Sequence, residues 1–72
     1  MAKKKKKEGQ QIVDKCNALA RLLYQYMGYE VRRGYRFDKA LYPQEASLWN
    51  QAAMAYEFIT GIDPNDHLED EA

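Results

Sequence analysis

The sequence predicts an all-α protein built on an antiparallel two-helix hairpin, with a short third helix near the C-terminus. Apolar residues recur at helical spacing in two separate stretches, and a glycine that can end a helix follows each stretch. The third observation is size. With 72 residues, one cysteine and one histidine, the chain offers neither an internal disulfide nor a four-ligand zinc site. We therefore expect self-association, as a homodimer or higher oligomer, to help complete the core.

Residues 1–9 are expected to form a disordered basic arm. The consecutive lysines Lys3 to Lys7 repel one another, and nothing apolar is available to order them. The residues that follow are polar, so the arm does not read as a secretory signal peptide. No apolar run approaches the roughly 20 residues that a transmembrane helix needs. Together with the lone thiol, these features favour a cytoplasmic protein.

The first helix is expected over residues 10–27 because its apolar residues recur at intervals of three and four. The stripe comprises Ile12, Cys16, Leu19, Leu23 and Tyr26, widened by Val13, Ala20, Leu22 and Met27. Gly28 follows at the position where a left-handed residue commonly ends a helix, and Tyr29 is expected to fold back on Tyr24. Cys16 is expected to be a buried apolar residue with a raised thiol pKa.

The second helix is expected to start at Pro43 and to end at Gly61, which completes a hairpin domain over residues 10–62. Its predicted apolar face comprises Leu48, Trp49, Ala52, Ala53, Tyr56 and Ile59. The alanines allow another helix to approach closely. Residues 63–72 are acidic, and Asp63 followed by Pro64 has the pattern of an N-cap that begins a short third helix.

The connector, residues 29–42, is compatible with a miniature hairpin or with an irregular loop. Aromatic residues alternate with charged ones around Gly34, as in a hairpin, but a lone two-stranded hairpin is weak. We favour an irregular loop anchored by its aromatic rings. It is expected to end with Asp38 capping a helical turn through Lys39 and Leu41.

The connector is also the predicted partner-binding site, because guanidinium groups and aromatic rings occur there together. Its candidate contact residues are Tyr29, Arg32, Arg33, Tyr35, Arg36 and Phe37. Such residues are common in protein interfaces, and they can also hold phosphates and stack on bases. The alternative is structural: the rings pack inward and the arginines pair with Glu30, Asp38 and Glu45. The acidic segment contributes a second candidate surface for a basic partner, consisting of Asp63, Asp66, Glu69 and Asp70.

Nothing in the sequence assembles a catalytic set. Cys16 and His67 are far apart, and the tail lacks the glycine and the distal glutamate of a calcium-binding loop. We expect a non-enzymatic protein that uses no cofactor and binds no metal. From Gly9 to Ile62 there are six basic and five acidic residues, so the body is nearly neutral. This balance argues against a dedicated nucleic-acid-binding protein.

The stretch GYRFDKALYPQEASLW (Gly34 to Trp49), followed by AYEFITG (Ala55 to Gly61), resembles small accessory proteins encoded by phages and prophages. The resemblance implies a cytoplasmic binding protein that modulates a host protein or complex, for example as an inhibitor of a host factor. Two alternatives stay open. One is a nucleic-acid-binding accessory protein that uses the lysine-rich arm and the connector, and the other is a structural subunit of a larger assembly.

Overall fold

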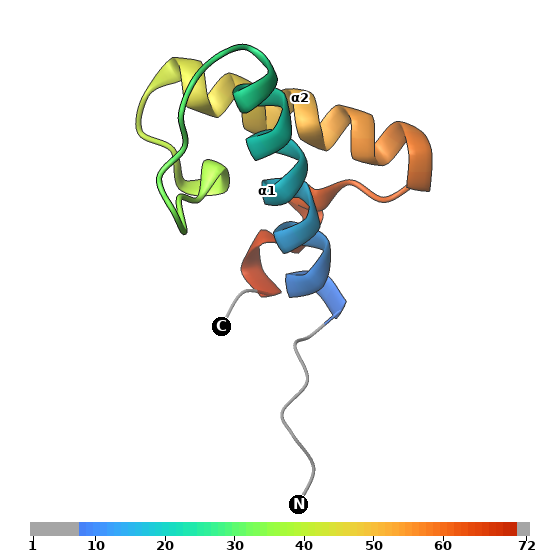
Figure 1. Cartoon of the computed structure of the whole chain (residues 1–72). Coiled ribbons are helices and arrows are strands. Elements are labelled where there is room, and N and C mark those ends of the chain that lie inside the picture. The colour runs from blue at the N-terminus through green and yellow to red at the C-terminus, as the bar shows by residue number, and fades with distance from the viewer. Residues whose placement is uncertain (1–7, 71–72) are drawn as a thin grey trace, which may run out of the picture.

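The computed structural model describes residues 8–70, which form two α-helices and two 3₁₀ helices without a strand among them. Their order is α1 (Glu8–Tyr26), η1 (Phe37–Lys39), α2 (Pro43–Thr60) and η2 (Pro64–Asp70). The all-α class is thus confirmed. In Figure 1, α2 lies across α1, and η2 lies against the N-terminal half of α1.

The first helix begins at Glu8, so two residues of the predicted disordered arm, Glu8 and Gly9, are helical instead. The rest of that arm, residues 1–7, lies outside the described part of the chain. The buried residues of α1 are Ile12, Val13, Cys16, Ala20 and Tyr24. They recur at helical spacing and form one face. The predicted apolar face differs from the buried face toward the C-terminal end of the helix: Leu22, Tyr26 and Met27 were predicted to lie on it but are exposed. Tyr24 replaces them in the core.

The end of α1 has the hydrogen bonds of a Schellman motif around Gly28, whose φ of 100° is left-handed. The Gly28 N–H donates to the Gln25 carbonyl at 2.9 Å, and the Tyr29 N–H donates to the Tyr24 carbonyl at 3.3 Å. The rings of Tyr24 and Tyr29 stack with centroids 4.7 Å apart. The predicted contact between these two residues is therefore confirmed, and it sets the direction in which the connector leaves α1.

The second helix has proline at its start, and Gly61, with a φ of 80°, ends it. Leu48, Trp49, Ala52 and Ala53 are buried as predicted, but Tyr56 is only half-buried and Ile59 is exposed. The reason is the crossing of the helices in Figure 1: α1 crosses the middle of α2, where the buried residues lie, and the last turn of α2, residues 57–60, is exposed. At the core, the small side chains of Ala20, Ala52 and Ala53 allow close packing of the two helices.

The C-terminal segment docks onto the core as η2, and the predicted cap is confirmed. The Asp63 carboxylate accepts a hydrogen bond from the Asn65 N–H at 3.0 Å. Pro64 is buried, and the Trp49 indole N–H donates to the Asn65 side-chain oxygen at 2.8 Å. Leu68 packs against the core from the same segment. These contacts explain why so short a helix persists.

Candidate functional site

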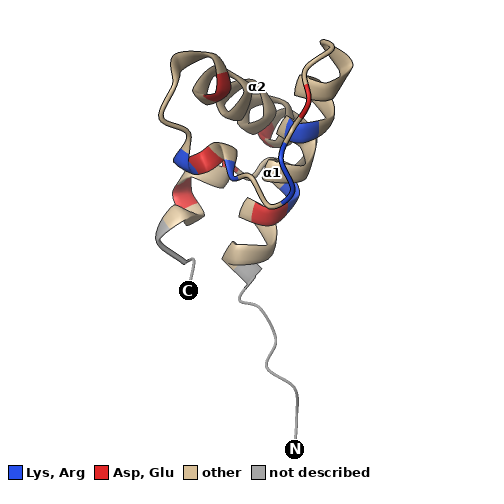
Figure 2. Ribbon diagram, turned by 60° about the vertical axis from the view of Figure 1, so that its left-hand side comes forward, with Lys and Arg blue, Asp and Glu red and all other residues tan. Residues whose placement is uncertain are grey.

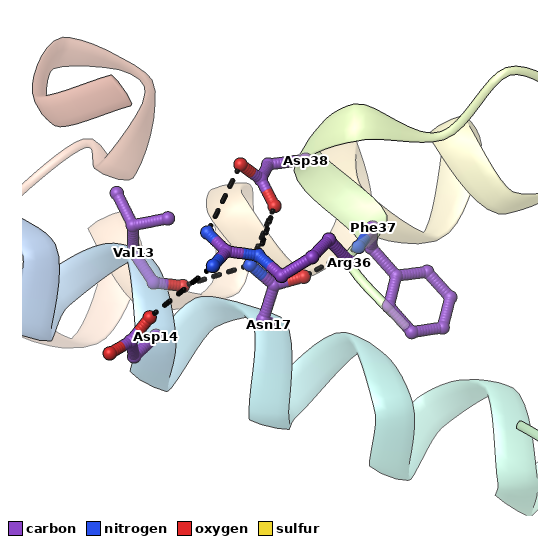
Figure 3. Close-up of polar contacts among 6 residues, drawn as sticks. All are labelled: Val13, Asp14, Asn17, Arg36, Phe37 and Asp38. Atoms are coloured by element: carbon purple, nitrogen blue, oxygen red, sulfur yellow. Dashed lines mark hydrogen bonds and ion pairs between the residues drawn. The ribbon is translucent and has the colours of Figure 1, made fainter. Parts of the chain in front are cut away.

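Asn17 of α1 hydrogen-bonds to two residues of the connector and helps to hold it against the body of the protein (Figure 3). Its Oδ1 accepts a hydrogen bond from the Phe37 N–H at 2.6 Å. Its Nδ2 donates to Asp38 Oδ1 at 2.8 Å and to the Val13 carbonyl at 3.3 Å. Asn17 was missed by sequence reasoning. The available signal was an amide side chain directly beside the apolar stripe of a helix, where a polar group needs a partner.

Arg36 and Asp38 form the second part of this attachment. Arg36 donates from Nε to Asp38 Oδ1 at 3.0 Å and from Nη2 to Asp38 Oδ2 at 3.3 Å, while Asp14 lies 4.0 Å from Nη1. The Asp38 side chain is only 2% exposed. A carboxylate buried to that degree needs its paired cation. Arg36 therefore has a structural role, and because its side chain is still 34% exposed, its contact with a partner stays a prediction.

Two further details of the connector differ from the sequence prediction. The helical turn is Phe37–Lys39, two residues earlier than predicted, and Asp38 lies within it instead of capping it. Phe37 is 1% exposed and contacts Tyr24 and Tyr35 edge-to-face, at centroid distances of 5.6 and 5.0 Å. It belongs to the core and cannot contact a partner in this conformation. Tyr35 is half-buried against the same cluster.

The remaining connector residues are accessible, and α1 adds a third guanidinium to them. Arg32 and Arg33 are exposed, and Tyr29 is 45% exposed. Arg21 of α1 donates from Nη2 to the Arg32 carbonyl at 3.0 Å. Figure 2 shows the basic part of the connector beside a basic stretch of α1. We call Arg21, Arg32 and Arg33 the arginine patch. The inward-packing alternative thus holds for Phe37 and Arg36 but not for Arg32 and Arg33.

Beneath the connector lies a cavity of about 110 Å³ that we call the connector pocket. It is lined by Tyr24, Glu30, Val31, Arg32, Tyr35 and Glu45. The Tyr24 hydroxyl donates to Glu45 Oε2 at 3.0 Å, whereas Glu45 Oε1 is buried and accepts no hydrogen bond from the described residues. Burial, and then the hydrogen bond and charge of Glu45, raise the pKa of Tyr24. The pocket connects the end of α1 with the first turn of α2.

The acidic candidates do not share one arrangement. The Asp63 carboxylate is engaged with Asn65, and Asp66 is exposed on η2. Glu69 and Asp70 belong to η2, and their side chains lie outside what the structure describes. Asp63 therefore stabilises its own segment. Of the four acidic candidates, Asp66 is the one whose side chain the structure shows to be exposed to a partner.

The chemistry of the described residues is limited. Cys16 is fully buried, and burial, followed by the charges of Asp38 and Asp63, raises its pKa to about 12. A thiol with such a pKa does not form the thiolate that a nucleophile needs at neutral pH. Within residues 8–70, no three side chains among His, Cys, Asp and Glu gather in a way that could hold a metal ion. No helix in that range is long and apolar enough to cross a membrane.

Comparison with known proteins adds no family to this description, since no family model, curated protein or solved structure matches the chain.

Proposed function

We propose that this chain is a non-enzymatic cytoplasmic protein that binds another protein through the exposed part of its connector and modulates that partner. The expected contact residues are Tyr29, Arg32 and Arg33, with Arg21 beside them. The lone buried cysteine and the resemblance of residues 34–61 to phage-encoded accessory proteins support the cytoplasmic setting and a host protein as the partner.

One observation carries this proposal: much of the apolar side-chain surface of the described residues is outside the core. Nine large apolar side chains are exposed, while four of the ten core residues are Cys or Ala. Five of the nine lie within residues 26–42, the stretch of sequence that also contains Arg32 and Arg33 (Tyr26, Met27, Tyr29, Leu41 and Tyr42). Exposed aromatic side chains next to arginines are typical of the residues that dominate binding energy in protein interfaces.

The attachment by Asn17 and Asp38 gives this surface a further property that suits binding. The connector has no strand and little helix, yet its centre is held against α1. The contacts are the hydrogen bonds of Asn17 to Asp38 and to the Phe37 N–H. A loop that is already held in place loses less conformational entropy when a partner binds. The same attachment leaves the arginine patch facing outward.

The test is capture of a partner from cytoplasmic extract by the immobilised protein, compared with the double variant Arg32→Ala/Arg33→Ala. We expect the wild type to retain a discrete partner that the double variant loses, with unchanged helicity in both. Lys15→Ala removes an exposed cation outside the connector and is the matched control. Equal capture by the double variant would exclude the connector as the contact surface. Arg36 is kept intact in this experiment because it holds Asp38.

Nucleic acid is the second candidate partner, and the arginine patch is the observation that favours it. Three guanidiniums that each replace one counterion on B-DNA give a slope of roughly −2.7 in the logarithm of affinity against the logarithm of salt concentration. Arg21→Ala should then reduce that slope by about one unit. Absence of any DNA or RNA shift at low salt would reject this candidate.

A further inference from the structure

The connector pocket is lined by side chains from three segments of the chain. Tyr24 comes from the end of α1, Glu45 from the first turn of α2, and Tyr35 from the connector. Two aromatic rings and a carboxylate thus line one cavity. Glu30 and Arg32 line it too, so its formal charge is −1, from two carboxylates and one guanidinium.

The Glu45 carboxylate is only half satisfied. Its Oε2 accepts the Tyr24 hydroxyl proton at 3.0 Å, and a hydroxyl has no second proton to give to Oε1. Oε1 is buried and without a donor among the described residues. Leaving a buried carboxylate oxygen unpaired is unfavourable, so a group in this pocket whose N–H donor reaches Oε1 gains a hydrogen bond that the free protein lacks.

The pocket walls favour a positive charge on that group. Tyrosine rings attract cations to their faces. Burial, and then the charge of Glu45, raise the pKa of Tyr35, which shows that the carboxylate acts on the second ring as well. Arg32 acts in the opposite direction on Tyr35, but its guanidinium forms no ion pair with Glu45. Arg32, the cationic side chain that lines the pocket, is therefore not paired with the Glu45 carboxylate.

We propose that the connector pocket receives the cationic end of a lysine or arginine side chain, which pairs with Glu45 between the rings of Tyr24 and Tyr35. The assignment of that side chain to a protein partner rests on the proposed function. A cavity of about 110 Å³ corresponds to the volume of about three to four water molecules, so it has room for a small cationic group but not for a larger ligand. The rest of the partner would then contact the arginine patch with acidic or aromatic groups.

The pocket can be tested without the partner by following backbone amide signals in NMR while methylguanidinium or methylammonium is added. We expect saturable shifts at Val31, Tyr35 and Glu45, with a dissociation constant on the order of millimolar for so small a ligand. The tighter of the two ions identifies arginine or lysine as the occupant. Tetramethylammonium carries the same charge without N–H donors, so it keeps the attraction of the rings but loses the hydrogen bond to Glu45 and should bind more weakly.

Glu45→Gln is the decisive variant, because the amide oxygen still accepts the Tyr24 hydroxyl proton while the charge is lost. It should weaken binding at least about tenfold, since one charge-assisted hydrogen bond is removed. Glu57→Gln, which removes an exposed carboxylate from the same helix, should leave binding unchanged. Arg32→Gln removes a like charge at the pocket without touching the core and should tighten binding a fewfold.

Shifts that do not saturate, equal binding by Glu45→Gln, or equal binding of tetramethylammonium would each overturn the pocket assignment. Weaker binding by Arg32→Gln would do the same, and this variant decides the matter if Glu45→Gln fails to fold. Suppose that the small cations do not bind, but the wild type captures a partner that Arg32→Ala/Arg33→Ala loses. This result would reject the pocket and leave the proposed function in place. Cation binding without any partner capture would reject the proposed function and keep the pocket.

Discussion

Replacing Asn17 by alanine removes two of the hydrogen bonds that attach the connector to α1 and gives the sharpest test of how the fold is held together. Three hydrogen bonds are lost, at 2.6, 2.8 and 3.3 Å, and one of them is made to a carboxylate that is 2% exposed. A neutral hydrogen bond contributes about 1 kcal/mol net and one to a charged group about 1.5–3 kcal/mol. The bond to Val13 is long, and water can replace part of the rest, so we expect a loss of about 2–4 kcal/mol.

This loss is large for a chain of this size. At about 0.05–0.15 kcal/mol per residue, the described residues have a total stability of roughly 3–9 kcal/mol. With a urea dependence of about 1 kcal/mol per molar for a small protein, the unfolding midpoint should fall by about 2–4 M. The assay is urea unfolding followed by far-ultraviolet circular dichroism and by the fluorescence of Trp49, the single tryptophan.

Asn50→Ala is the matched control, because it removes an exposed asparagine from α2. It should change the free energy of unfolding by no more than about 0.5 kcal/mol. If Asn17→Ala unfolds at the same urea concentration as Asn50→Ala, then the contacts in Figure 3 contribute no net stability. The idea of a connector held ready for binding would then be refuted.

Three further predictions concern stability. Arg36→Ala leaves the Asp38 carboxylate buried without its cation and should lower the free energy of unfolding by about 1–3 kcal/mol. Arg33→Ala is the control and should lower it by less than about 0.5 kcal/mol. Equal urea midpoints for the two variants would contradict this prediction. Gly28→Ala should lower the free energy of unfolding by about 1 kcal/mol because of the left-handed φ of 100°. An added Cβ meets nothing within 4 Å, so the cost comes from backbone conformation alone. It is measurable as a lower midpoint in thermal unfolding. Burial raises the pKa of Cys16 in the folded state from the ordinary thiol value of 9.0 to about 12, so the folded state holds the thiol proton more tightly. Its contribution is complete below pH about 9 and is lost as the pH rises, by up to about 1.4 kcal/mol per unit; a Cys16→Ala variant with the same loss between pH 8 and 10 would contradict this.

The helices could be predicted from the sequence because their signals are local. The spacing of apolar residues and the positions of Pro43, Gly28 and Gly61 depend on neighbours a few residues away. Apart from Leu22, the exposed positions that were predicted to be buried, Tyr26, Met27 and Ile59, lie at the ends of their stripes. Which part of a stripe is covered depends on where the two helices cross, and spacing along one helix does not contain that information.

The candidate site was predictable only in part for the same reason. Arginines and aromatic rings together indicated the connector, and Arg32 and Arg33 are indeed accessible. Separating them from Arg36 and Phe37 required contacts across about twenty residues of sequence, from Asn17 to the start of η1. The pocket required a third element, since Glu45 meets Tyr24 only after α2 has folded back.

The uncovered end of α2 also offers a way to locate a partner. Beyond Ala55 and Tyr56 the last turn of this helix has no buried side chain, and Phe58 and Ile59 are 91% and 77% exposed. Backbone amides there open locally without unfolding the core, so their hydrogens should exchange with deuterium faster than those around Trp49 and Ala52. A bound protein that rests on this end would slow that exchange, and one that rests on the connector alone would leave it unchanged. A deuterium footprint thus distinguishes the two surfaces before any partner residue is known.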